Sequence, residues 1–293
     1  QMRDPDSSLL PKSVTVHRAR NPSPMTGLGT NCYVFHGEQT LILDPGPADT
    51  DFLHHLRDQI HTPVGAILIS HAHLDHSGNA RRAQDMFDAP IWAFGDAMSG
   101  RDPAVCALAI NLPEGYGVDQ NFKPDQTLCH GDRLSTGHNT LTVHHIPGHM
   151  GNHICVDLDG EFFTGDHILE WTTTMIAPPE GSLDDFLSSC KHLLTCKPKR
   201  LWPAHGPQID APTARITQIM QHRQTRHAQI IQAAQAGATN LTDLRQRLYP
   251  NLSPTLHMAA DASVMSHLIS LHRDNKIEFQ GLGTQTLEIS WIS

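Results

Sequence analysis

The sequence predicts a layered α/β (α+β) fold followed by a smaller domain of winged-helix type, and three observations support this. Short apolar runs alternate with segments of helical spacing over the first two hundred residues, as in βαβ units. One run, residues 64–70, is continuously apolar, as expected of a strand buried on both faces. After Pro212 the pattern changes to long helical segments. We therefore expect two domains, residues 1–212 and residues 213–293.

The elements of the first domain follow from apolar runs and the turn residues between them. Two strands flank residues 36–38, and Pro45-Gly46-Pro47 ends the second. Ser182 is expected to cap a helix that runs to about Thr195. The other helices are expected at 51–60 and 77–87, and the other strands at 64–70, 89–94, 140–146, 153–158, 161–164 and 200–203.

The second domain is predicted as three helices and a hairpin, which is the order of a winged-helix domain. The helices are expected at 213–236, 241–248 and 255–274, and the strands at 276–279 and 286–291. Such a domain could clamp nucleic acid with its third helix, cover an active site or make a dimer contact. The third helix region carries only Arg273 and Lys276 as full positive charges, which favours the last two roles.

Composition and charge exclude some classes of protein. The net charge is −9, with −11 on residues 1–213 and +2 on residues 214–293, so the basic stripe typical of tight nucleic-acid binding is missing. No stretch approaches the roughly 18–20 apolar residues of a membrane span. The N-terminal segment resembles neither a signal nor a transit peptide, and a cytoplasmic location is expected. The six cysteines form no C-x-x-C motif, so we expect reduced thiols.

The chemistry-bearing motif is SHAHLDHSG, residues 70–78, which directly follows the apolar run. Its H-x-H-x-D-H pattern should arise by chance in roughly one chain per hundred, so further evidence is needed. That evidence comes from three distant positions, each at a predicted strand end beside glycine or proline. The seven candidate metal ligands are His71, His73, Asp75, His76, His149, Asp166 and His205.

Seven nitrogen and oxygen donors are too many for one tetrahedral zinc ion. They suit two metal ions that share a bridging group. The donor types suit Zn²⁺ and also permit manganese or iron. We therefore expect two Zn²⁺ ions per chain.

This residue set resembles the metallo-beta-lactamase superfamily over about residues 29–207. The resemblance implies a four-layer αββα sandwich, and it extends to Asp44 in LILDPGP as a residue that supports the metal loops. It implies that His71, His73 and His149 bind one metal, that Asp75, His76 and His205 bind the other, and that Asp166 bridges them.

One residue that differs from the zinc beta-lactamase pattern indicates the branch of the superfamily. True zinc beta-lactamases commonly place a cysteine where this chain has Asp166, so antibiotic hydrolysis is not expected. The resemblance is strongest to the lactamase-beta-like branch, which is related to glyoxalase II and to endoribonucleases. It is carried by NPSPMTGLGTNCYVF at residues 21–35, by residues 171–187 and by the winged-helix-like tail.

The expected mechanism is attack by a metal-bridging hydroxide on an acyl carbon or on phosphorus. Asp75 is the candidate catalytic residue that orients the nucleophile and moves its proton. His153 is a candidate for a supporting role or a substrate contact, with an ordinary strand-end role as the alternative. His144 and His145 point to opposite faces of one strand, and we expect structural roles for both. Residues 171–173 are candidates for the pocket wall.

Two enzymatic hypotheses follow. A hydrolase of a small ester, thioester or lactone predicts an enclosed, partly apolar pocket and weak salt dependence. A metal-dependent endoribonuclease predicts cleavage of single-stranded RNA and steep inhibition by salt. A metal-bearing winged-helix regulator and an oxygen-using iron enzyme are further alternatives. A homodimer is compatible with either hydrolase hypothesis. Hydrolysis of the small substrate is preferred.

Overall fold

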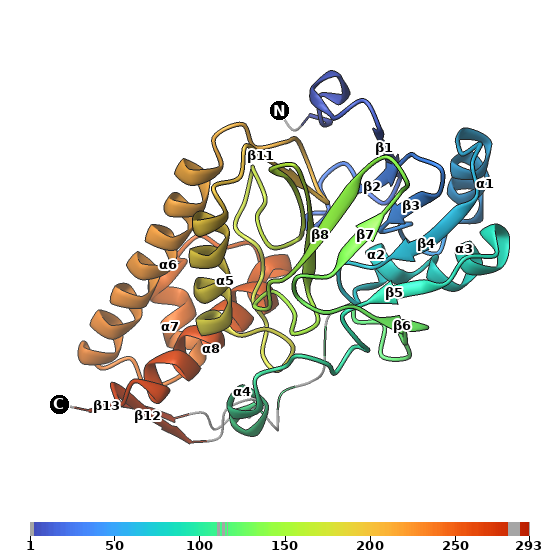
Figure 1. Ribbon diagram of the computed structural model, residues 1–293. Helices are drawn as coiled ribbons and strands as arrows, with labels where there is room; N and C mark the ends of the chain where they lie inside the picture. Colours follow the sequence, from blue (N-terminus) through green and yellow to red (C-terminus); the bar gives the residue numbers. More distant parts are fainter. Residues whose placement is uncertain (1–2, 110–111, 113–114, 116, 281–287, 293) are drawn as a thin grey trace.

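The structure is a computed structural model, and it describes residues 3–109, 112, 115, 117–280 and 288–292. Two β-sheets pack face to face, and helices cover their outer faces (Figure 1). The predicted αββα sandwich is therefore confirmed. No helix among these residues is long and apolar enough to span a membrane.

The first sheet has six strands in the order β1-β2-β3-β4-β5-β6. Its first three strands pair antiparallel, and the pairs from β3 to β6 are parallel. The strands are β1 (Val14–Ala19), β2 (Thr30–Phe35), β3 (Thr40–Leu43), β4 (Val64–Leu68), β5 (Ile91–Ala93) and β6 (Gln126–Thr127). Helices α1 (Thr50–Gln59), α2 (Leu74–Ser77) and α3 (Ala80–Phe87) belong to this half of the sandwich, after the short 3-10 turn η1 (Ser7–Leu9).

The second sheet has five strands in the order β11-β10-β9-β8-β7, of which only the β10–β11 pair is parallel. The strands are β7 (Arg133–Ser135), β8 (Thr140–His145), β9 (Ile154–Leu158), β10 (Glu161–Gly165) and β11 (Arg200–Pro203). Helices α5 (Leu183–Cys196) and α6 (Pro212–Gln235) cover its outer face. Ser182 caps α5 as predicted, because its hydroxyl accepts from the Asp185 amide at 3.3 Å.

The core between the sheets follows the alternation of side chains along each strand. Tyr33 and Phe35 of β2 point into the space between the sheets, whereas Cys32 and Val34 pack under α1 and α3. Phe163 of β10 meets Tyr33 and Phe35 edge-to-face, at ring-centroid distances of 4.9 and 4.8 Å. These aromatic contacts hold the two sheets in register.

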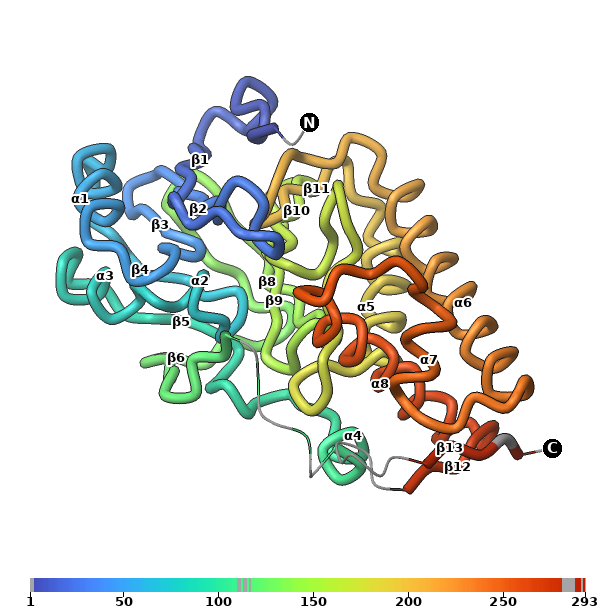
Figure 2. The backbone as a smooth tube through the Cα atoms, turned by 180° about the vertical axis from the view of Figure 1, so that it is seen from behind, coloured from blue at the N-terminus to red at the C-terminus, as the bar shows by residue number. Residues whose placement is uncertain are grey.

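The tail contains α7 (Leu241–Leu248), the 3-10 turn η2 (Pro254–Leu256), α8 (His257–Arg273), β12 (Ile277–Gln280) and β13 (Glu288–Trp291). β12 and β13 form an antiparallel hairpin, so the predicted winged-helix order is confirmed. Part of the predicted strand at 286–291 lies outside the described residues. Figure 2 shows α7 and α8 beside α5 and α6.

The tail shares its core with a helix that precedes it by more than a hundred residues. Val105 of α4 (Pro103–Leu108), together with Ala109 and Leu112, packs with tail residues such as Leu268 and Ile277. The boundary between residues 212 and 213 stays a prediction, because α4 contributes to both parts of the chain.

One predicted helix begins later than expected. The helix expected at 77–87 starts at Ala80 as α3, and a separate short helix, α2, precedes it and ends at Ser77. A Cβ at Gly78 would lie 2.4 Å from the Leu74 carbonyl oxygen and 2.8 Å from the Ala48 nitrogen, so the chain needs glycine there. The Asn79 side chain then binds both the amide and the carbonyl of Asp49 at 3.0 Å.

Candidate metal centre

The seven predicted ligands lie at the ends of strands from both sheets. His71 and His73 follow β4, and Asp75 and His76 lie on α2 directly after them. His149 follows β8, Asp166 follows β10 and His205 follows β11. Loops at strand ends can converge while the sheets hold their bases rigid. The structure brings all seven side chains to one place.

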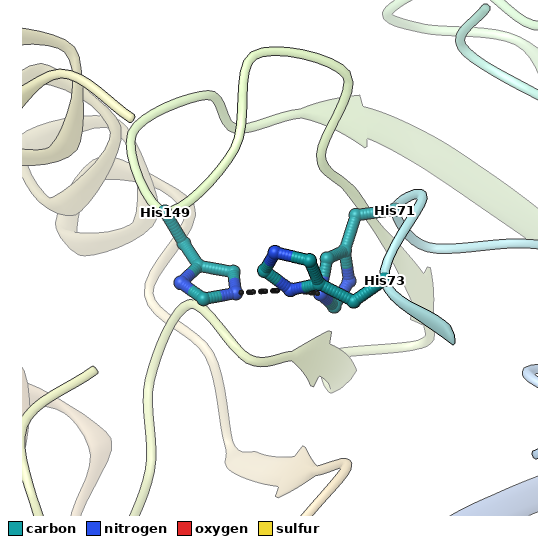
Figure 3. Close-up of side chains that lie close together, drawn as sticks. All are labelled: His71, His73 and His149. Carbon is teal, nitrogen blue, oxygen red and sulfur yellow. Dashed lines mark hydrogen bonds between the residues drawn. The ribbon is translucent and has the colours of Figure 1, made fainter. Parts of the chain in front are cut away.

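Three imidazoles form the first group of donors. The Nε2 of His71 lies 2.9 Å from the Nδ1 of His73, which lies 3.1 Å from the Nε2 of His149. Figure 3 shows His71 and His73 on one side and His149 reaching them from the opposite loop. A tetrahedral zinc ion with Zn–N bonds near 2.0–2.1 Å would separate its nitrogen ligands by about 3.3 Å. The spacing therefore fits one metal ion.

The second group combines two imidazoles with carboxylates. The Nε2 of His205 lies 3.3 Å from an oxygen of Asp75, and the Nε2 of His76 lies 3.5 Å from the same oxygen. Asp166 lies between the two groups. Its Oδ1 is 3.2 Å from His205 and 3.5 Å from His76, and its Oδ2 is 3.8 Å from the Nε2 of His149.

The outer nitrogens of four histidines are held by other groups. His149 Nδ1 donates to the Met175 carbonyl at 2.6 Å, and His205 Nδ1 donates to the Gly29 carbonyl at 3.0 Å. The same pattern holds for the Nδ1 of His76, which contacts Asp44 at 2.9 Å, and of His71, which contacts the Ser70 hydroxyl at 3.0 Å. A neutral imidazole carries one N–H, so once each ring is neutral its inner Nε2 can present a lone pair to a metal at the centre.

Two buried atoms at the centre lie near charged groups but make no hydrogen bond. The Nε2 of His76 and the Oδ1 of Asp166 make no hydrogen bond with any described residue. An orphaned buried donor or acceptor is costly, and a bound ion is one of the explanations it calls for. Together with the convergent lone pairs, these two atoms show that the residues fit a pair of cations.

The two groups differ in their electrostatics. Burial, followed by the charges of neighbouring imidazoles, lowers the pKa of His71 well below its usual value. Burial and His149 lower the pKa of His73 to about 3. Burial also lowers the pKa of His205, but Asp166 and Asp75 outweigh it and raise this pKa to about 10. The first group is therefore neutral, and the second attracts positive charge that a metal would supply while displacing protons.

Asp44 connects the strand ends beneath the metal loops. Its carboxylate accepts from the Ser70 amide at 2.7 Å, from the Ser70 hydroxyl at 2.6 Å and from His76. Its backbone is left-handed, with φ of 54°. Asp44 thus lies outside the donor groups and orients one of their members.

His153 is fully buried and is not among the residues that line the pocket, which favours the supporting role over a substrate contact. Its Nε2 instead accepts a hydrogen bond from the backbone amide of Asp166 at 3.1 Å. The ring also stacks on His71, with centroids 4.8 Å apart. His153 therefore fixes the chain segment that carries the central carboxylate.

A cavity of about 470 Å³ opens beside the donors, and the tail forms one of its walls. Asp75 and Asp166 are at its floor, and Trp171, Thr172 and Thr173 line it as predicted. The tail residues in its wall are Tyr249, Leu252, Leu256, Ala259, Ala260 and Ser263. Of the roles considered for the tail, the structure therefore has it covering the site.

Two arginines of α6 were missed by sequence reasoning. Arg215 donates to the carbonyls of Leu169 at 2.9 Å and Thr172 at 2.6 Å, and the Nη2 of Arg223 donates to the carbonyl of Thr174. The Thr174 hydroxyl in turn contacts the Nδ1 of His149 at 3.0 Å. The spacing of eight residues places both arginines near one helix face, which was the available signal.

The chain is similar to known families in both of its parts. Residues 25–205 match the family described as Metallo-beta-lactamase superfamily, and residues 241–285 match the Beta-lactamase associated winged helix domain.

Curated relatives match over most of their length. A Beta-lactamase-like protein 2 homolog of Drosophila melanogaster is 30% identical over 270 residues, which cover 88% of this chain and 87% of that protein. An Atrochrysone carboxyl ACP thioesterase of Passalora fulva is 26% identical, over 94% of this chain and 80% of that protein.

Solved structures share the fold across both parts. A beta-lactamase domain protein from Burkholderia ambifaria aligns with a TM-score of 0.79 at 20% identity, over 98% of this chain and 95% of that one. A metallo-beta-lactamase family protein from Thermus thermophilus gives a TM-score of 0.76 at 20% identity, over 96% of this chain and 99% of that one.

Proposed function

From the premise that the chain belongs to the metallo-beta-lactamase superfamily and is a hydrolase, we propose that it uses two zinc ions to cleave a small ester, thioester or lactone. The observation that carries this proposal is the cavity of about 470 Å³ beside the donors, which the tail closes on one side. A cavity of this volume lies in the usual range for small-molecule sites.

The walls of the cavity favour an acyl substrate. Leu169, Trp171 and Met175 line it from the first part of the chain, and Leu252 and Leu256 line it from the tail. Such side chains bind the apolar part of a substrate by excluding water. We infer that the scissile carbonyl lies at the donor end and the acyl chain along these walls.

Two metal ions held by the seven ligands would supply a nucleophilic water of lowered pKa and would polarise the substrate carbonyl. The protein's own residues then have separate tasks. The Asp75 side chain is 27% exposed and faces the cavity, whereas that of Asp166 is 13% exposed and lies between the groups. We therefore assign proton acceptance to Asp75 and the bridging position to Asp166.

A thioester is the first substrate class to test. One relative, which matches this chain over most of its length, is named an Atrochrysone carboxyl ACP thioesterase. At 26% identity the chemistry can be shared while the acyl group differs. The cavity of this chain would then set the acyl chain length.

The ribonuclease alternative finds less support. The tail carries no basic stripe, and α8 is buried along much of its length, including Val264, Leu268 and Leu271. A helix that reads or clamps RNA needs an exposed, polar face. The assays below therefore include a single-stranded RNA, whose cleavage would support this alternative.

The test begins with metal analysis of protein purified without added metal. Parallel assays then use a thioester, an ester, a lactone and a single-stranded RNA, each at low and at high salt. We expect two zinc ions per chain and acyl turnover that changes little with salt. Finding manganese or iron in place of zinc would overturn the proposed metal. RNA turnover that salt inhibits steeply would overturn the proposed class of small acyl substrates.

The Asp166→Ala variant tests the paired arrangement itself. We expect it to lose most activity, because its carboxylate contacts donors of both groups. Full activity with at most one metal ion per chain would contradict the bridging role. An Asp210→Ala variant, which changes an exposed carboxylate paired with Arg200, is the matched control.

A further inference from the structure

A second cluster of three histidines lies on the outer face of the second sheet, where α5 packs against it. His144 lies on β8, His192 on α5, and His130 on the loop before β7. His145, the neighbour of His144, points to the opposite face, where its ring stacks on Phe94 at 3.6 Å. We call His130, His144 and His192 the outer triad.

The outer triad has nearly the dimensions of the triad in the metal centre. Its ring centroids lie 5.1, 5.3 and 5.5 Å apart, against 4.6, 4.8 and 4.9 Å for His71, His73 and His149. One donor atom from each ring lies within 4.8 Å of the other two. The shortest contact joins His144 Nδ1 and His192 Nε2 at 3.1 Å.

A sulfur atom completes the cluster. Cys196 lies one turn after His192 on α5, and its Sγ is 3.6 Å from the His192 Nε2. Zinc bonds of about 2.3 Å to sulfur and 2.0–2.1 Å to nitrogen imply a sulfur–nitrogen separation of about 3.6 Å and a nitrogen–nitrogen separation of about 3.3 Å. The His144–His192 and His192–Cys196 contacts thus each have the spacing of two ligands of one ion.

The fourth ligand can reach the same point by a small movement. His130 is exposed, and its ring nitrogen accepts a long hydrogen bond, 3.3 Å, from the His145 amide. An exposed ring with a long contact of this kind can change rotamer at little cost. Burial, followed by the neighbouring histidines, lowers the pKa of His144 to about 4, so this ring is neutral and ready to bind metal at pH 7.

We propose that His130, His144, His192 and Cys196 bind one transition-metal ion of the Zn²⁺, Co²⁺ or Cu⁺ type, separate from the catalytic pair. Three imidazoles and a thiolate select such ions over Mg²⁺ and Ca²⁺, which prefer oxygen. On binding a divalent ion, the Cys196 thiol loses its proton to solvent and the sulfur forms the bond to the metal. The ion joins α5 to strand β8 across the face of the sheet.

The test uses a donor that the catalytic centre lacks. None of the seven ligands there is a cysteine, so a cobalt–thiolate charge-transfer absorption reports the outer site alone. Co²⁺ is titrated into the full chain after its catalytic centre has been filled with zinc. We expect the absorption to saturate at one cobalt per chain.

Variants assign the ligands. We expect Cys196→Ser to abolish the absorption and His192→Ala to weaken cobalt binding by about tenfold or more. Cys106→Ser is the matched control, because it changes another half-buried thiol, on α4, and should leave the titration unchanged. No absorption in the parent protein, or one that survives both variants, would overturn the proposal. Loss of the cobalt absorption in Cys129→Ser but not in Cys196→Ser would overturn the assignment of Cys196 as the ligand.

The His130→Ala variant removes a proposed ligand without an expected effect on folding. Because His130 is exposed, its removal should leave the Tm of the cobalt-free protein and kcat/KM unchanged. We expect cobalt to raise the Tm of the parent protein and to raise that of His130→Ala much less. Equal shifts in both proteins would contradict binding by this triad.

Discussion

The two histidine triads contain the same side chains at similar spacing but differ in what surrounds them. In the metal centre, His71 contacts the Ser70 hydroxyl and His149 donates to the Met175 carbonyl, so the outer nitrogen of each ring has a partner. In the outer triad, the Nε2 of His144 is buried without a partner among the described residues. Outer partners fix which nitrogen carries the proton and where the ring points.

We expect this difference to separate a tightly binding site from an exchangeable one. His71 is fully buried and His149 is 6% exposed, whereas His130 is exposed and the rest of the outer triad is half-buried. A pre-oriented, dry set of ligands loses little entropy when it binds a metal, but a mobile set must be ordered first. We therefore expect tight binding at the centre and weaker, reversible binding at the outer triad.

The largest expected effect comes from removing one ligand from each triad. His149→Ala should lower kcat/KM on a thioester by about a thousandfold or more, because a catalytic metal loses a donor. His192→Ala should change kcat/KM by less than about twofold, since His192 is remote from the cavity lining. Steady-state kinetics of both variants measure this, and equal losses would break the distinction between the triads.

Removing an outer partner is expected to have the next largest effect. In Ser70→Ala, His71 loses the partner of its Nδ1 and Asp44 loses a donor. Metal affinity of the centre should fall by about 10–100-fold, as measured by competition with a chelator. Ser99→Ala removes a serine hydroxyl bonded to Asp96 and is the control. An unchanged affinity in Ser70→Ala would show that the outer partners do not distinguish the triads.

The pH dependence of metal binding should differ between the triads. Burial lowers the pKa of His73 to about 3, so this ring has no proton to displace between pH 7 and 8. Burial raises the pKa of the Cys196 thiol, so at these pH values a metal must displace one proton there. Cobalt affinity at the outer triad should therefore rise about tenfold per pH unit, as its charge-transfer absorption can measure. A pH-independent outer site would argue against a thiolate ligand.

The smallest expected effect concerns the contact between α6 and the metal centre. Arg223→Met removes the donor to the Thr174 carbonyl, and with it the support of the segment that contacts His149. We expect kcat/KM to fall about fivefold while the cobalt absorption of the outer triad is unchanged. Arg226→Met, on the same helix, removes an arginine that stacks on Tyr249 and is the control. A similar loss in the control would mean that the effect is not specific to this contact.

Local signals predicted the sandwich and the seven side chains that converge at one place; that these side chains bind metal stays a prediction. A buried strand such as β4 has a continuous apolar run, and a metal-binding loop directly after it places several donors within six residues. The break at Gly78 and Asn79 was not predicted, because it depends on the close approach of Ala48 and Asp49. β1 was missed although Val14-Thr15-Val16-His17 alternates apolar and polar residues, because this alternation covers only four residues and ends at His17-Arg18.

Contacts between distant segments could not be predicted. His144 and His192 are 48 residues apart, and only the packing of α5 on β8 brings their rings together. Arg223 meets Thr174 across 49 residues in the same way. Neither helical nor strand periodicity contains information about which partner lies opposite a given face.

The packing of α4 into the tail has a consequence for how the protein unfolds. Val105 and Leu112 complete a core whose other members, such as Ile230 and Leu268, lie in α6 and α8. Deleting the tail would expose apolar side chains on a part of the chain that is not deleted. We therefore expect the two parts to unfold as one cooperative unit, and we expect a chimera that exchanges the tail to need a matching α4.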